Sequence, residues 1–107
     1  MSSATHLNDL PWETVRPALA TGVAGRTLLD AGTKVVYTSV EPGGGFAQHV
    51  DRYAHLLFVL KGEGVAGAGD VEYRLEPGVV LRIDAGERHF YRNSGSDPLE
   101  LISMNLP

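Results

Sequence analysis

Glycine and proline divide this sequence into short runs, and that pattern constrains the fold more than any other feature. The chain has 107 residues, of which 13 are glycine and 6 are proline, and both types are spread along its length. Because 43% of the residues are hydrophobic, the chain is too apolar for intrinsic disorder. The pattern therefore favours many short elements joined by turns, in one domain with one core.

The runs between these turns are β-branched, aliphatic or aromatic, and no helical period is sustained beyond the N-terminal third of the chain. They predict eight to ten short strands, of which the clearest are Val23–Asp30, Lys34–Glu41, Phe46–Asp51, His55–Lys61, Val71–Leu75, Val79–Asp84, Arg88–Arg92 and Leu99–Leu106. Pro42-Gly43-Gly44-Gly45 predicts a sharp break, and Gly69-Asp70 predicts a hairpin turn. Short strands at regular spacing are typical of an all-β sandwich or a closed barrel.

The N-terminal part of the chain differs from the rest. Residues 1–22 are predicted to form an extension, and residues 23–107 to form the domain. A short helix from Trp12 to Leu19 is possible within the extension, although Pro17 interrupts it.

Composition excludes several classes of function. The sequence has no cysteine, which excludes disulfides, thiolate-ligated metals and thiol catalysis. Its net charge of −4 argues against a nucleic-acid-binding face. No apolar run reaches the roughly 18 residues of a membrane span, and no basic start followed by an apolar core marks a secretory signal. We therefore expect a cytoplasmic protein that binds a small molecule and contacts neither nucleic acid nor membrane.

Histidine and aspartate supply the candidate metal ligands. His49 and Asp51 are two residues apart, so on a strand their side chains point to one face. His55 opens the next predicted strand, and His89 lies on a later one, whereas His6 lies in the polar N-terminal stretch. Imidazole and carboxylate donors suit Mn, Fe, Co, Ni, Cu or Zn. From spacing alone, a surface His–Asp pair and a core histidine are more common explanations of these residues than a metal site.

Two spaced motifs in this region resemble those of the cupin family. Residues 43–62 follow the pattern G(X)5HXH(X)3-4E(X)6G, with Gly43, His49 and Gly62 in register. Residues 78–93 follow G(X)5PXG(X)2H(X)3N. In that second motif Gly78, Gly86, His89 and Asn93 match, and Asp84 replaces the proline. The resemblance covers roughly residues 34 to 106 and implies a small jelly-roll β-barrel with a metal near its middle.

The departures from the first motif define the ligand set that the resemblance implies. His55 stands at the glutamate position, which resembles the small cupins with four histidines on the metal, whereas Asp51 replaces the second histidine. One divalent transition metal is then expected on His49, Asp51, His55 and His89. Asp51 either binds the metal directly or orients a neighbouring imidazole.

A metal-dependent enzyme acting on a small organic substrate is the function we favour from the sequence, with dioxygenase chemistry first. A site with three neutral imidazoles suits an anionic or enolisable substrate. Asp51 and Tyr91 are the candidate groups for proton transfer. The alternatives are a metal-dependent isomerase or cyclase, and a binding module without turnover.

The run His55–Lys61 is apolar on both faces. If His55 points inward, Leu57 and Val59 do too, and the opposite face is also apolar. Such a strand is expected where another layer covers the outside. We expect a homodimer, as is common in the family; the alternative is a monomer whose N-terminal segment folds over this face with Trp12 as its anchor.

Overall fold

The computed structural model describes residues 2–107, and it is built almost entirely of strands. A 3-10 helix, η1 (Leu7–Asp9), comes first. The strands are β1 (Glu13–Thr14), β2 (Ala20–Ala31), β3 (Thr33–His49), β4 (His55–Lys61), β5 (Gly64–Ala68), β6 (Val71–Leu75), β7 (Val80–Ile83), β8 (His89–Asn93) and β9 (Leu99–Asn105). The all-β prediction is confirmed. Within residues 2–107 no helix is long and apolar enough to cross a membrane.

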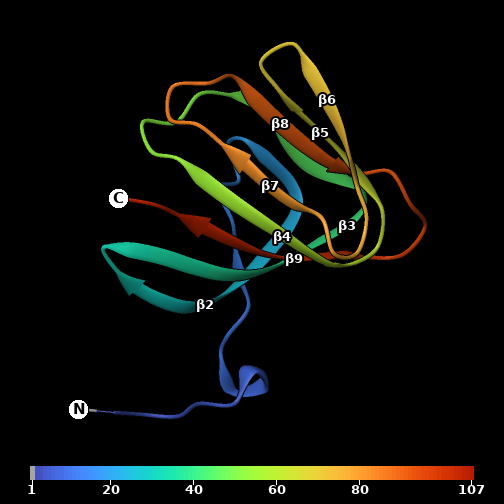
Figure 1. The fold of residues 1–107 in the computed structure, drawn as a ribbon. Helices are drawn as coiled ribbons and strands as arrows, with labels where there is room; N and C mark the ends of the chain where they lie inside the picture. The colour runs from blue at the N-terminus through green and yellow to red at the C-terminus, as the bar shows by residue number, and fades with distance from the viewer. Residues whose placement is uncertain (1) are drawn as a thin grey trace.

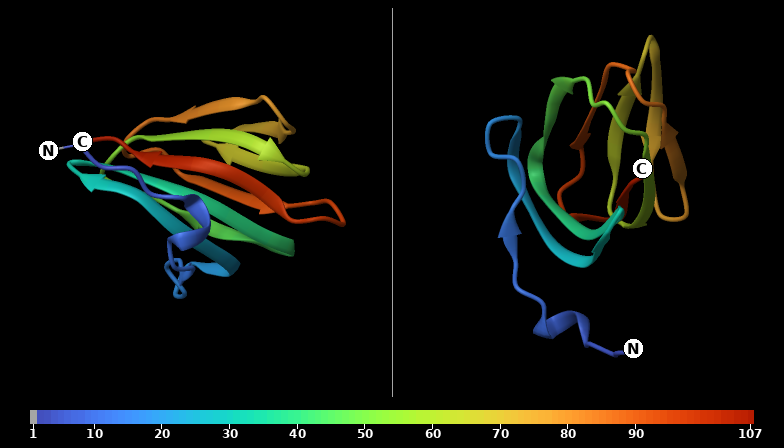
Figure 2. Two further views of the ribbon diagram at one scale, coloured as in Figure 1. Left: turned by 90° about the horizontal axis from the view of Figure 1, so that it is seen from below. Right: turned by 90° about the vertical axis from the view of Figure 1, so that its left-hand side faces the viewer.

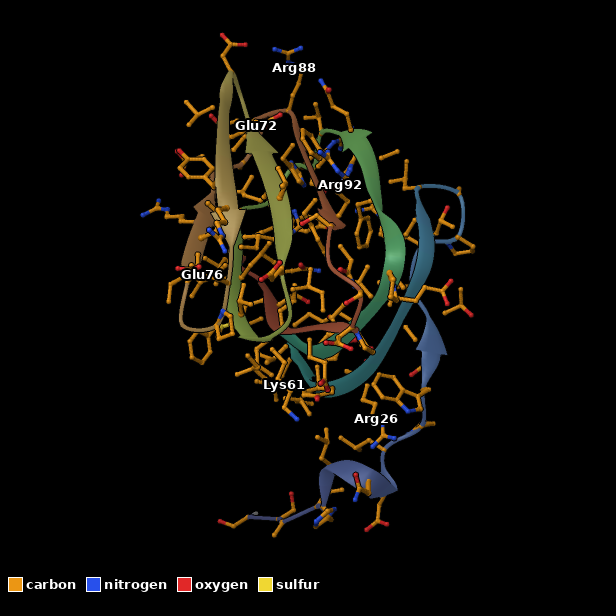
Figure 3. The ribbon with its side chains drawn as sticks, turned by 90° about the vertical axis from the view of Figure 1, so that its right-hand side faces the viewer. Arg26, Lys61, Glu72, Glu76, Arg88 and Arg92 are labelled. Atoms are coloured by element: carbon orange, nitrogen blue, oxygen red, sulfur yellow. The ribbon has the colours of Figure 1, made fainter. Side chains whose placement is uncertain are left out.

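All strands belong to one antiparallel sheet that curls on itself as a small jelly roll (Figure 1). Its order is β6-β5-β8-β3-β9-β4-β7, with β2 paired to β3 and β1 paired to β2. Figure 2 shows the curl from two further sides, with the N-terminal segment projecting away from the barrel. Charged side chains such as Glu72, Glu76 and Arg88 point outward from it (Figure 3).

The expected helix from Trp12 to Leu19 does not form. β1 and a turn occupy this stretch instead, and the turn is closed by hydrogen bonds from the amides of Leu19 and Ala20 to the Arg16 carbonyl. Pro17 has no amide hydrogen to donate, and pairing with β2 gives Glu13 and Thr14 an alternative to helix. The 1–22 extension therefore enters the sheet, because β2 already begins at Ala20.

The sharp break expected at Pro42 to Gly45 is also absent, because β3 runs through it as one strand. Residues 34–40 pair with β9, and from Gly45 onward β3 pairs with β8. Pro42 lies where the β2–β3 register shifts, so it displaces no ladder hydrogen bond. The change of partner bends β3 from one side of the barrel to the other.

Strand β5 was not among the expected strands because its sequence, GVAGA, lacks large side chains. At Gly67 the ring of Phe90 occupies the space of a side chain: a Cβ there would lie 2.2 Å from Cε1 of Phe90, so the ring would have to move. The hairpin predicted at Gly69-Asp70 is confirmed, with Ala68 opposite Val71 and Gly69 at φ +61°.

The core fills the inside of the barrel with side chains from both of its walls. Leu57 and Val59 are buried as expected, whereas Phe58 on the opposite face is 39% exposed. The core comprises Val23, Val40, Leu57, Val59, Ala66, Ala68, Leu75, Leu81, Ile83, Tyr91, Leu99 and Leu101. Trp12 packs on the outer face against Tyr37, with ring centroids 6.0 Å apart, but it leaves Phe58 uncovered. The N-terminal segment thus covers only part of the outer face of the sheet.

Candidate metal centre

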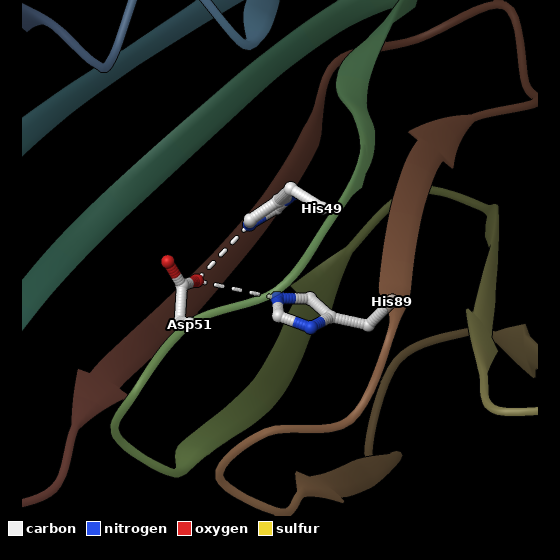
Figure 4. Close-up of side chains that lie close together, drawn as sticks. All are labelled: His49, Asp51 and His89. Atoms are coloured by element: carbon white, nitrogen blue, oxygen red, sulfur yellow. Dashed lines mark hydrogen bonds and ion pairs between the residues drawn. The ribbon is translucent and has the colours of Figure 1, made fainter.

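The four side chains named as candidate ligands lie together at one end of the barrel interior. His49 ends β3, Asp51 follows it, His55 begins β4 and His89 begins β8. The Nε2 atoms of His49, His55 and His89 lie 3.0, 2.9 and 3.5 Å from Oδ2 of Asp51. Figure 4 shows His49 and His89 converging on this carboxylate from two strands. All four side chains are nearly buried, with Asp51 5% exposed.

The backbone brings these residues together through two links. His49 and His89 are directly opposite in the β3–β8 register, so the strand pairing alone places their rings together. The amide of Gly86 donates to the carbonyl of Asp51 at 2.8 Å, which joins the β3–β4 connection to the turn before β8. Gly86 has φ +81°, a conformation that glycine adopts without strain.

The other ring nitrogen of each histidine is held by an oxygen acceptor. Nδ1 of His49 donates to the Ala47 carbonyl at 2.7 Å, and Nδ1 of His89 donates to the Glu87 carbonyl at 2.9 Å. Nδ1 of His55 lies 3.1 Å from Oδ1 of Asn105. A neutral imidazole that donates through Nδ1 carries a lone pair on Nε2. His49 and His89, whose Nδ1 atoms donate to backbone carbonyls, therefore direct Nε2 lone pairs at one Asp51 oxygen, an arrangement that suits a cation between them.

Burial and neighbouring groups shift the pKa values of Asp51 and His89. Burial raises the pKa of Asp51, but hydrogen bonds from His55 and Arg16 outweigh it, so the pKa of this carboxyl lies below its usual value. Burial lowers the pKa of His89, which keeps this imidazole neutral near pH 7. Asp51 is thus an anion facing a neutral imidazole.

Arg16 belongs to this site and was not anticipated from the sequence. Its Nη1 atom donates to both Asp51 oxygens, at 3.0 Å to Oδ1 and 3.2 Å to Oδ2. The backbone of Arg16 has φ +39°, which is left-handed and costs a non-glycine residue about 1–3 kcal/mol. The only signal in the sequence is a cationic residue before Pro17, which by itself indicates a turn and not a ligand.

A cavity of about 260 Å³ opens beside the four side chains. Its lining includes His49, His55 and His89, apolar side chains such as Phe46 and Leu57, and the N-terminal residues Glu13 to Arg16. This volume, just below the usual range for drug-sized ligands, suits a small organic molecule.

Two tyrosines and a serine also line this cavity. Tyr91, one of the two candidates for proton transfer, lines it and is 7% exposed. Burial raises the pKa of the Tyr91 phenol well above its usual value, so the phenol keeps its proton at neutral pH. Tyr53 packs on His55 with ring centroids 4.9 Å apart, and Ser103 lies on β9, the strand paired with β4.

Comparison with known proteins shows which family model the sequence matches and which solved structures share the fold. The family model of the cupin domain matches residues 36–105. No curated protein matches the sequence.

Several solved structures share the fold at low sequence identity. A predicted oxalate decarboxylase from Thermotoga maritima is 20% identical, with a TM-score of 0.87 over 97% of this chain and 98% of that one. The polyketide cyclase RemF from Streptomyces resistomycificus is 23% identical, with a TM-score of 0.88 over 98% of this chain and 79% of that one. Rru_A2000 from Rhodospirillum rubrum, a cupin-2 domain, is 23% identical, with a TM-score of 0.80 over 98% and 74% of the two chains. At such identities these likenesses show the fold alone.

Proposed function

Because this chain belongs to the cupin domain family, we propose that it holds one divalent transition metal on His49, Asp51, His55 and His89 and acts as a metal-dependent enzyme on a small organic molecule. The observation that carries the proposal is the convergence of three Nε2 atoms on one Asp51 oxygen, with Nδ1 of each ring engaged elsewhere. In metal sites, an acceptor that binds one ring nitrogen of a histidine orients the ring so that the other nitrogen faces the metal.

The distances fit a metal of this kind. Two ligands about 2.1 Å from one ion lie about 3.0 Å apart at right angles and about 3.4 Å apart in a tetrahedron. The three Nε2 atoms are 2.9 to 3.5 Å from Oδ2 of Asp51. The ligand atoms of His49, Asp51 and His89 all lie within 4.8 Å of one another. We therefore propose Oδ2 of Asp51 as the fourth ligand, with Oδ1 held by Arg16.

A metal here supplies Lewis-acid polarisation of a substrate oxygen or, when redox-active, activation of O₂. The protein's own groups favour the second class. Asp51 is engaged by Arg16 and by the histidines, and Tyr91 keeps its proton, so Tyr91 serves as a hydrogen-bond donor to the substrate and not as a base. Among the residues of this cavity that the structure describes, Glu13 is the one carboxylate in the lining. Isomerase and cyclase reactions require a base, and Glu13 lies on the exposed strand β1, so we propose dioxygenase-type chemistry first and an isomerase or cyclase with Glu13 as its base as the alternative.

Metal analysis of protein purified without added metal tests the site. We expect close to one metal ion per wild-type chain and a large loss of metal in His89→Ala. His6→Ala is the matched control, because His6 lies in the N-terminal segment and its Nδ1 accepts only from the Asn8 amide. A folded wild-type protein without metal, or wild-type occupancy in His89→Ala, would overturn the metal centre.

Oxygen uptake tests the reaction class. The metal-loaded protein is incubated with catechols and with β-diketones, while dissolved O₂ and substrate absorbance are followed together. O₂ consumption that matches substrate loss supports a dioxygenase. Substrate conversion without O₂ uptake overturns it in favour of an isomerase or cyclase, and ligand binding without conversion favours a non-catalytic module.

We also propose that the protein forms a homodimer through the outer face of the sheet. An apolar row crosses β3, β9, β4 and β7 at Tyr37, Ile102, Phe58 and Val80. Val80 is 60% exposed, so a second copy packed on this row removes apolar surface from water. Sedimentation velocity is expected to show a dimer that Phe58→Glu dissociates and that Val71→Glu, on β6, leaves intact. A monomeric wild-type protein would exclude the dimer.

A further inference from the structure

Arg16 reaches from the surface to a buried carboxylate. Its side chain is 41% exposed, whereas that of Asp51 is 5% exposed. The guanidinium has five N–H donors, and within residues 2–107 its hydrogen bonds are made through Nη1 alone. One edge of the guanidinium thus holds Asp51, and the donors on its other nitrogens remain available to a molecule in the cavity.

The backbone holds Arg16 in place from both sides. The turn that begins at Arg16 is closed by the amides of Leu19 and Ala20, and the preceding Val15 donates its amide to the Val23 carbonyl at 3.2 Å. A left-handed arginine persists only when the surrounding structure determines it, and such residues concentrate at ligand-binding sites. A structural ion pair with Asp51 would not require this conformation, because long arginine side chains reach carboxylates from ordinary backbone.

The cavity wall around Arg16 matches an anion with an apolar body. Arg16 and Lys34 are the two cationic side chains of the lining and Glu13 is its one carboxylate, while the adjacent Asp51 carboxylate is already paired with Arg16. The remaining wall carries apolar groups, including Val36, Phe46 and Ile83. Arginine presents a planar fork that matches a carboxylate in two parallel hydrogen bonds.

We propose that Arg16 is the specificity-determining residue of this cavity, which binds the carboxylate of a small organic acid whose apolar part lies against the inner wall. The proposal rests on the cavity being the substrate site, as proposed above. Arg16 keeps Asp51 on its Nη1 edge while the free donors receive the ligand. The N-terminal segment, outside the region that matches the family model, then selects the substrate of this chain.

NMR titration with benzoate and benzamide tests the proposal, because the two probes differ in charge and hardly in shape. Both are added to ¹⁵N-labelled protein, once metal-free and once loaded with zinc, which has no redox chemistry. We expect the wild type to bind benzoate at least about tenfold more tightly than benzamide in both forms. Arg16→Gly is the main variant, because glycine adopts φ +39° without strain and the fold is kept.

Arg16→Gly is expected to lose the preference for benzoate while its benzamide affinity changes by less than about twofold. Arg16→Lys keeps the positive charge but lacks the planar, two-pronged guanidinium, so we expect it to retain part of the preference for benzoate over benzamide. Arg82→Ala is the matched control, since Arg82 pairs with Asp84 at 3.2 Å on the surface. Equal affinities of the wild type for the two probes, or a wild-type preference in Arg16→Gly, would overturn the proposal. Zinc content measured on the same samples separates this outcome from failure of the metal centre.

Discussion

His49 and His89 lie directly opposite each other on β3 and β8, with ring centroids 4.3 Å apart. One comes from the first of the two spaced motifs and the other from the second, so the strand pairing joins the motifs at their histidines. The pairing exists because β3 leaves β9 and joins β8 beyond Gly45. The bend at 42–45 is therefore what builds the candidate metal centre.

Asn105 is expected to tune metal affinity through His55, because its Oδ1 atom lies 3.1 Å from Nδ1 of that ring. Removing such a partner frees the ring to rotate and typically weakens metal binding about 10–100-fold. Asn105→Ala should therefore weaken zinc binding by this factor in a competition titration with a chromogenic chelator. Ser103→Ala, on the same strand and cavity wall, should bind zinc like the wild type. Equal affinities of the two variants would contradict this role of Asn105.

Asn93 is expected to be essential for stability. Its buried Nδ2 donates to the carbonyls of Val40 and Asp97 at 2.9 and 2.8 Å, and its Oδ1 accepts from the Gly95 amide at 2.8 Å. Asn93→Ala leaves these backbone groups without their partner, which should cost about 2–4 kcal/mol. Urea unfolding followed by circular dichroism measures this loss. Ser94→Ala, at the neighbouring exposed position, should change stability by less than about 0.5 kcal/mol. A similar small change in Asn93→Ala would show that water replaces the side chain.

One strand pairing could be anticipated, at a place where turn residues and a strand run agree. Gly69-Asp70 and the alternating run Val71–Leu75 both point to the β5–β6 hairpin that forms. Two elements could not be anticipated. The turn of this hairpin is signalled in the sequence but strand β5 before it is not, because β5 is made of small residues and its Gly67 meets the ring of Phe90, a contact between distant positions. The second element is the Pro42–Gly45 stretch. Its proline and glycines indicate a break, and local propensity does not show that β3 continues there and changes its partner strand.

The four side chains of the candidate site could be anticipated because each lies within a motif of fixed spacing. His49 and Asp51 lie together as expected, although β3 ends at His49 and not at the predicted Asp51, and a short connection returns His55 to them. Arg16 could not be anticipated, since it is 35 residues from Asp51 and lies outside both motifs. The position of Arg16 depends on the pairing of β1 with β2, and a strand of two residues leaves no recognisable pattern in the sequence.

Tyr37 should titrate unusually late. Burial, the hydrogen bond to the Glu100 carboxylate and the charge of that carboxylate raise the pKa of Tyr37 to about 12. The folded state then keeps a proton that the unfolded chain loses near pH 10. The stability from this group is therefore full below pH 10 and is lost as the pH rises through about 12.

Absorbance titration at the phenolate band, taken as the difference between wild type and Tyr37→Phe, isolates this tyrosine. Glu100→Gln removes the negative charge and should lower the pKa of Tyr37 toward 10. A Tyr37 component that already titrates at the ordinary value in the wild type would contradict the contact with Glu100.

Gly62 should tolerate no side chain, and Gly32 provides a matched control for the reason. Both have positive φ, +91° and +83°, so alanine strains the backbone at either position by about 1 kcal/mol. At Gly62 an added Cβ would also lie 2.6 Å from the Pro98 carbonyl oxygen and 2.9 Å from Cα of Leu99, whereas nothing lies within 4 Å of one at Gly32. Gly62→Ala should therefore lose about 1–3 kcal/mol more than Gly32→Ala in urea unfolding, because the clash is with backbone that cannot rotate away. Equal losses in the two variants would mean that the β4–β5 turn shifts to make room, and that Gly62 is required for its φ angle alone.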